Sequence, residues 1–406
     1  TTPTALKGLK DQLPLLEQLV AVSGLLRQRR HATGSFELDL PMPELPSLGD
    51  LRPPAPEAPA AGGLVALPEA HPVAILREVV LVAERCLGQH LAALELPALY
   101  AVQPPADPAA LNDVAKAALA LEIPLELSAE GNADAAELAA AFAATDRRRA
   151  LQQQLREALA PVQLSEEAGP HGLAGEPNAL APWCLPGLHY ADLWNQQVVI
   201  TLLLEGKNRP SVRHRTTVDL AGDSCHGAVD WPLLTPSQLT PFQEALARGL
   251  ATRLNSRAQV LHEVSQDVLA LAQARHAESL VGQTLPGMIS GVQSYGFFVE
   301  VPPSQVEGLV HVSSLKDDWY EYRSRQSRLV GRKFRRNYMI VDPVEVVIEK
   351  VDPLRHQIDL AVIQPELPEP PVALEQGLDD DGEDRGLDDD GDDSDDGEPD
   401  FERSAD

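Results

Sequence analysis

The 406-residue sequence has only three cysteines and no long apolar run. Cys86, Cys184 and Cys225 are widely separated, and none belongs to a Cys-x-x-Cys pair. This spacing predicts a reducing compartment and argues against a zinc site. Cys225 is followed by His226, but the pair has no third partner nearby in the sequence. No apolar run reaches the length of about eighteen residues that a membrane span needs, and no signal peptide is recognisable. We therefore expect a cytoplasmic protein with no membrane partner.

Basic residues are also a minority, with 33 Lys and Arg against 61 Asp and Glu, for a net charge of −28. The excess is uneven, because the last 32 residues hold 17 acids and two arginines. Residues 366–406 therefore predict a disordered acidic tail, and basic patches elsewhere remain able to bind RNA. A second interpretation of the tail is an RNA mimic that competes for such a patch.

Period-two alternation of apolar residues is clearest between residues 281 and 365, with glycine, proline and aspartate between the alternating runs. Five such runs predict a small OB-type barrel. The expected strands are a pair around the Ser294-Tyr295-Gly296 turn, then residues 308–312, 344–351 and 358–362.

Aromatic and basic side chains in this region indicate binding to single-stranded RNA. Flat rings stack on any base, and a cluster of cations favours a polyanion. The basic stretch from Arg323 to Arg336 contains no acid. The alternative is that one ring fills the core and the arginines form a solvated loop. The candidate RNA-binding residues are Tyr295, Phe297, Phe298, His311, Arg323, Arg325, Arg328, Arg332, Lys333 and Arg355.

The preceding residues 1–280 read as mainly helical, so the fold class is α+β. Apolar residues at helical spacing predict helices over 13–30, 73–94 and 133–159, and Asp107-Pro108 predicts a further helix start. Thr240-Pro241-Phe242-Gln243 has the pattern of a capping box, followed by a long helix toward Ala277. Residues 45–68 are rich in proline and alanine and predict a loop or linker.

Several segments resemble known families. Residues 287–301, 308–315 and 351–360 are similar to the RNA-binding domain first described in ribosomal protein S-one. The insert around Trp319, Arg328 and Tyr338 resembles the C-terminal domain of ribonucleases II and R. Residues 77–84, 97–100, 169–173 and 186–193 resemble the RNB catalytic domain of the same family, and residues 194–215 its cyanobacterial-like branch. The resemblance implies that residues 1–280 are the C-terminal portion of the RNB domain in a truncated chain.

The resemblance implies 3′→5′ hydrolysis of RNA to nucleoside monophosphates, with Mg²⁺ held by a tight aspartate cluster. No such cluster is found before residue 281. The aspartates Asp39, Asp50, Asp107, Asp113 and Asp146 are isolated from one another. We therefore expect no catalytic residue and no metal ligand for Mg²⁺ in this chain.

Other positions also depart from the family pattern. Where the family has Ser-Pro, an apolar residue and Arg-Arg-Tyr, this chain has Leu185-Pro186-Gly187-Leu188-His189-Tyr190. His189 and Tyr190 remain candidates for an RNA channel, although a histidine lacks the bidentate fork of arginine. Two further positions, an arginine and a glutamate in the family, are Ala101 and Ala258 here. The main hypothesis is the RNA-binding part of an exoribonuclease. The alternative is a non-catalytic RNA-binding protein on a degenerate nuclease scaffold.

Overall fold

The structure is a computed structural model that describes residues 12–38, 40, 45, 72–125, 133–145, 148–176, 178–323 and 328–363. The acidic tail, most of the loop predicted at 45–68, and Arg325 lie outside the described residues. The described part mixes helices and sheets, which confirms the α+β class.

Helices dominate the chain up to residue 278. They are α2 (Leu13–His31), α3 (Pro72–Ala93), α4 (Pro108–Ala120), α5 (Ala135–Ala143), α6 (Arg148–Ala158), α7 (Tyr190–Glu205), the short 3₁₀ helix η4 (Asp223–Cys225), α8 (Pro236–Ala247) and α9 (Leu250–Glu278). Asp107 begins α4 as predicted, because its carboxylate accepts a hydrogen bond from the Ala109 N–H at 3.0 Å. The stretch predicted as one helix over 133–159 is two helices, each with its own start.

Two apolar cores hold these helices, and α3 contributes to both. Leu81 packs with Phe142 and Leu151 in one core, whereas Leu87 and Leu91 pack in the other core. The second core also contains Trp194 of α7 and Phe242 of α8, whose rings meet edge to face at 5.2 Å. A two-stranded antiparallel sheet of β1 (Tyr100–Val102) and β2 (Gln163–Ser165) completes this part.

A buried ionic network joins α2 to α3. Arg30 donates to both carboxylate oxygens of Glu78, at 3.0 and 2.6 Å, and Arg77 donates to Glu37 at 2.7 Å. Arg27 and Arg30 also pair with Glu37. Burial opposes charge here, but the surrounding arginines lower the pKa of Glu37 and the carboxylates raise the pKa of Arg30. Burial has the larger effect on Arg77, whose pKa is lowered. Opposite charges therefore hold the network together, and burial partly opposes them.

The C-terminal part is the predicted barrel. Its strands are β3 (Thr284–Gln293), β4 (Gly296–Val301), β5 (Val306–His311), β9 (Pro343–Asp352) and β10 (Gln357–Val362), closed in the order β10-β5-β4-β3-β9. All neighbouring pairs are antiparallel except β5 with β10. The inward residues Ile289, Val299, Val310, Val346 and Ile348 are fully buried, as the alternation predicted.

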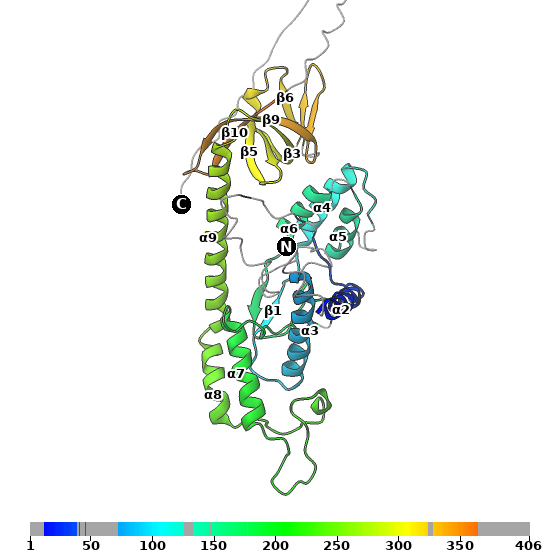
Figure 1. Cartoon of the computed structure of the whole chain (residues 1–406), viewed down its shortest axis with the longest axis vertical. Coiled ribbons are helices and arrows are strands. Elements are labelled where there is room, and N and C mark those ends of the chain that lie inside the picture. Colours follow the sequence, from blue (N-terminus) through cyan, green and yellow to red (C-terminus); the bar gives the residue numbers. More distant parts are fainter. Residues whose placement is uncertain are drawn as a thin grey trace, which may run out of the picture. The chain divides into compact units, whose positions relative to one another are not determined.

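The C-terminal end of α9 meets the barrel strands (Figure 1), and Ala277 belongs to the barrel core. A separate three-stranded sheet is inserted between β5 and β9, after the short 3₁₀ helix η5 (Val312–Ser314). Among the described residues, no helix has both the length and the apolar character that crossing a bilayer requires.

Candidate nucleic-acid interface

The inserted sheet has one aromatic face and one basic face. It consists of β6 (Tyr320–Arg323), β7 (Arg328–Gly331) and β8 (Asn337–Met339), paired antiparallel in that order. Alternation points Tyr320, Leu329 and Tyr338 into the barrel core. Arg323 and Arg328 are direct partners across the sheet and share the opposite face. The packing of the tyrosines therefore presents the arginines outward.

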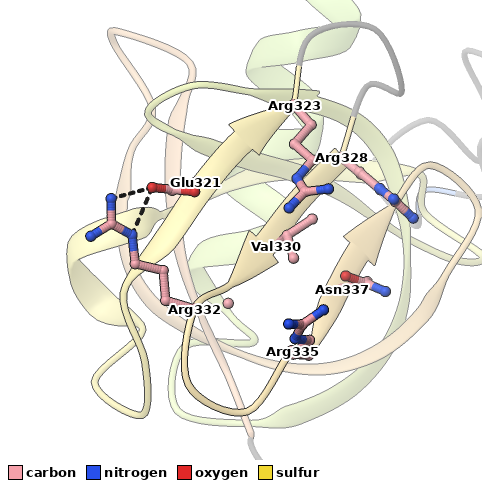
Figure 2. Close-up of a pocket in the computed structure, with 8 residues that line it drawn as sticks. Glu321, Arg323, Arg328, Val330, Arg332, Arg335 and Asn337 are labelled. Atoms are coloured by element: carbon pink, nitrogen blue, oxygen red, sulfur yellow. Dashed lines mark hydrogen bonds and ion pairs between the residues drawn. The ribbon is translucent and has the colours of Figure 1, made fainter.

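The basic face surrounds a pocket of about 290 Å³ (Figure 2). Four arginines and a single acid line it, so the pocket is strongly positive. Arg332 is bound to that acid, Glu321, through its Nε at 2.6 Å. Arg323, Arg328 and Arg335 form no ion pair with another residue that the structure describes. The lining residues are Glu321, Arg323, Arg328, Val330, Gly331, Arg332, Arg335 and Asn337.

Arg328 is the residue of this pocket that most needs a partner. It is half-buried, and its Nε is shielded from solvent without a hydrogen-bond acceptor among the described residues. A buried guanidinium N–H that lacks an acceptor is costly, and a phosphate oxygen is a suitable one. The Nε itself is enclosed, so a phosphodiester group in the pocket would be bound by the guanidinium groups of Arg323, Arg328 and Arg335 that line it.

Three of the predicted groups lie on the outside of the barrel, and we call Tyr295, Phe298 and His311 the ring surface. Phe298 lies on β4 and His311 at the end of the neighbouring strand β5. His311 pairs with Gly296, and Phe298 is two residues after Gly296, so the Phe298 and His311 side chains point to the same face of the sheet. The Tyr295 and Phe298 rings meet edge to face at 6.4 Å. Tyr295 is 44% exposed, Phe298 is half-buried and His311 is exposed. These groups can offer stacking faces to bases.

Phe297 corrects the prediction that all three rings of the 295–298 segment face RNA. Its side chain is fully buried and stacks on Tyr338 with ring centroids 4.6 Å apart. Neighbouring residues on a strand point to opposite faces, so Phe297 and Phe298 cannot both face outward. Phe297 fills the core, as the alternative in the sequence analysis allowed for one ring.

The other predicted cations lie outside the pocket. Lys333 stands over the Phe334 ring at 4.8 Å. Arg336 pairs with Asp317 at 3.2 Å, so acids that precede the basic stretch neutralise part of it. Arg355 is 76% exposed in the turn after β9, 3.8 Å from Asp352.

The two RNA-channel candidates lie at the start of α7. His189 is the N-cap residue and Tyr190 the first helical residue, which is 52% exposed. Leu188, beside them, is 71% exposed. An apolar side chain therefore stands on the surface here, where the resemblance leads one to expect arginine.

A buried carboxylate pair lies directly behind this turn. Glu84 and Asp192 are each 1% exposed, and Asp192 accepts from the Leu185 N–H at 2.7 Å. The Glu84 carboxyl makes no well-aligned hydrogen bond among the described residues, although the backbone N–H groups of Trp183 and Cys184 lie close enough to oppose the rise in its pKa. Burial, with the charge of Asp192, raises the pKa of Glu84 to about 8, and burial also raises the pKa of Asp192. Glu84 is therefore mostly protonated at neutral pH.

Comparison with known proteins identifies both parts of the chain. Residues 5–205 match the RNB domain, and residues 280–363 match the S1 RNA binding domain. The chain is 32% identical over 360 residues to the acetazolamide conferring resistance protein zam of Synechocystis, covering 87% of this chain and 45% of that protein. It is 26% identical over 130 residues to ribonuclease R of Thermotoga maritima, covering 32% of this chain and 18% of that protein. The chain thus spans less than half the length of these relatives.

Solved structures show the same fold. The apo form of Mycoplasma genitalium RNase R superposes with a TM-score of 0.65 at 15% identity, covering 86% of this chain and 49% of that one. The same protein in complex with ribose methylated single-stranded RNA gives a TM-score of 0.63 with the same coverage.

Proposed function

Because this chain belongs to the ribonuclease II/R family, with an RNB domain followed by an S1 RNA binding domain, we propose that it is the RNA-binding part of a 3′→5′ exoribonuclease. The positively charged pocket on the inserted sheet carries the proposal. Arg323, Arg328 and Arg335 bind the phosphates of single-stranded RNA there, and the ring surface stacks on bases. The solved RNA complexes of Mycoplasma genitalium RNase R support an RNA ligand.

Mg²⁺, which the family implies, does not fit the described residues. Among them, the one group of three side chains able to hold a metal contains two histidines and a cysteine, with no carboxylate. Mg²⁺ prefers oxygen ligands in octahedral geometry. We therefore propose no hydrolytic step for this chain alone.

We expect the pocket arginines to govern the salt dependence of RNA binding. The double variant Arg323→Ala/Arg328→Ala should bind a fluorescent single-stranded oligonucleotide more weakly, because two phosphate contacts are lost. The slope of log Kd against log salt concentration should fall by about 0.7 to 1 per arginine. Fluorescence anisotropy over a salt series measures both. Arg248→Ala removes an exposed arginine that follows the last residue of α8 and is paired with Glu244. It is the matched control and should change neither.

Ring-surface variants separate stacking from charge in the same assay. Tyr295→Ala should weaken binding roughly 5- to 150-fold, as expected for about 1 to 3 kcal/mol per stacked base, with an unchanged salt slope. Unaltered affinity in both the arginine and the tyrosine variants would exclude this surface as the RNA site.

We further expect no exonuclease activity from this chain. Incubation of a 3′-extended, labelled RNA with Mg²⁺ should release no mononucleotides, while an active ribonuclease R degrades the same RNA. Robust mononucleotide release from the chain would contradict the proposed lack of a catalytic cluster.

A non-catalytic RNA-binding protein is the second candidate. The exposed Leu188 and the half-buried His189 favour it, because truncation alone does not replace arginines. The coding sequence upstream of Thr1 distinguishes the two. An intact aspartate cluster there supports the exoribonuclease, and a degraded or absent one supports the binder.

A further inference from the structure

A histidine from α3 and a Cys-His pair more than 130 residues later in the sequence meet in the helical part of the fold. Histidine and cysteine are side chains that can bind metal ions. His90 lies near the end of α3, whereas Cys225 and His226 follow Asp223 in the segment between α7 and α8. Their ligand atoms all lie within 4.8 Å of one another. The nearest pair, His90 Nδ1 and His226 Nε2, is 2.9 Å apart.

The hydrogen bonds of His90 prepare it to be a ligand. Its Nε2 lies 3.0 Å from the Leu220 carbonyl oxygen, which can only accept. His90 Nε2 therefore carries the proton, and Nδ1 turns its lone pair toward His226 Nε2 and Cys225. A backbone carbonyl on the second ring nitrogen is the usual outer partner of a metal-bound histidine.

We propose that His90, Cys225 and His226 bind a zinc-type transition-metal ion. Two imidazole nitrogens and a thiolate are the donors such ions prefer, and they do not suit Mg²⁺ or Ca²⁺. In a tetrahedral site with Zn–N of about 2.0–2.1 Å and Zn–S of about 2.3 Å, neighbouring ligand atoms lie roughly 3.3 to 3.6 Å apart. The observed separations, from 2.9 Å to no more than 4.8 Å, bracket this range.

The surroundings favour a dication. Cys225 is fully buried in the core, where its Sγ–H donates to the Gly222 carbonyl oxygen at 3.1 Å, and metal binding would release this proton. The carboxylates of Asp219 and Asp223 act electrostatically on both His90 and Cys225. Three protein ligands leave a fourth position for water.

The ion would fasten the long connection between α7 and α8 to α3. Residues 206–235 contain no regular element except η4, so few backbone hydrogen bonds hold them. A metal that binds only the folded arrangement stabilises it by mass action. The role is structural and separate from the proposed RNA site on the barrel insert.

Metal content and a cobalt spectrum test the proposal. The chain is purified without a metal-affinity tag, stripped with chelator, incubated with Zn²⁺ or Co²⁺ and dialysed. We expect one bound ion per chain and, with Co²⁺, a thiolate-to-cobalt charge-transfer band. His90→Ala and Cys225→Ser should weaken binding by more than about 100-fold, since loss of an outer partner alone costs roughly 10- to 100-fold.

Two matched controls should keep the ion and the band. Cys86→Ser removes an exposed thiol from α3, and His214→Ala removes an exposed histidine from the α7–α8 connection. Failure of the unaltered chain to retain an ion, or retention of the thiolate band in Cys225→Ser, would overturn the proposal. If the site variants do not fold, the cobalt spectrum of the unaltered chain decides, because a band absent there excludes Cys225 as a ligand.

Discussion

Replacing Glu78 with alanine is expected to lower the free energy of unfolding of the helical part by about 3 to 5 kcal/mol. Glu78 and Arg30 are both buried, with 2% of each side chain exposed. Without the carboxylate, the Arg30 guanidinium keeps its bonds to Glu37 and to the Leu173 carbonyl oxygen but loses its bidentate partner. The network would then hold Arg27, Arg30 and Arg77 against the single carboxylate of Glu37, and such an excess of buried positive charge is costly.

Urea unfolding followed by far-ultraviolet circular dichroism measures this effect, because the helices give most of the signal. Glu17→Ala, an exposed acid on α2, is the control and should change stability by no more than about 0.5 kcal/mol. Glu78→Gln keeps the size and one acceptor, so its loss should fall between the two. Equal unfolding midpoints for Glu78→Ala and Glu17→Ala would show that the network does not hold α2 against α3.

The barrel could be predicted from sequence because its signal is local. Residues such as Val344, Val346 and Ile348 alternate within one strand, and the Ser294-Tyr295-Gly296 turn fixes the first strand pair. The same alternation shows that Phe297 and Phe298 face opposite ways. Phe297 shares its face with Val299 and Val301, whereas Phe298 shares its face with Glu300, so the local pattern also indicates that Phe297 is the ring that faces the core.

The arginine pocket could be predicted only in part. The basic stretch was evident, but its strands are three or four residues long, and their pairing sets Arg323 beside Arg328. The neutralising partners Glu321 and Asp317 lie just before the stretch, so a count within it overstates the positive charge. Alternation in Tyr320-Glu321-Tyr322-Arg323 was the signal that would have revealed β6.

Two features of the helical part could not be predicted from neighbouring residues in the sequence: the start of α8 and the residue that Cys225 and His226 meet. The pattern Thr-Pro-x-Gln occurs at both Thr235 and Thr240, and the structure places the capping box at Thr235, so the prediction at Thr240 was wrong. Pro241 lies inside α8 instead. The third partner of Cys225 and His226 is His90, 136 positions from His226, which spacing rules for metal sites do not reach.

The front part of the chain thus combines a buried network of ion pairs with a carboxyl group whose pKa is raised by burial. Replacing Glu84 with glutamine is expected to stabilise the chain by roughly 4 kcal/mol at pH 8 and by only about 1 kcal/mol at pH 5. The folded-state pKa of Glu84 is about 8, above its ordinary value of 4.5. Below the ordinary value the group is protonated in both states, so its burial costs little. As pH rises from about 4.5 to 8, the unfolded chain loses this proton first, and folding becomes less favourable.

Glutamine keeps the shape of protonated glutamic acid and cannot ionise, so it removes this pH-dependent loss. Urea unfolding at pH 5, 6, 7 and 8 measures the difference from the unaltered chain, with Glu263→Gln, an exposed acid of α9, as the control that should show no trend. A stability difference that is constant across this range would mean that Glu84 titrates normally. Glu84 and Asp192 lie directly behind Leu185 and His189. Because burial is what raises the pKa of Glu84, normal titration would also mean that water enters the turn before α7.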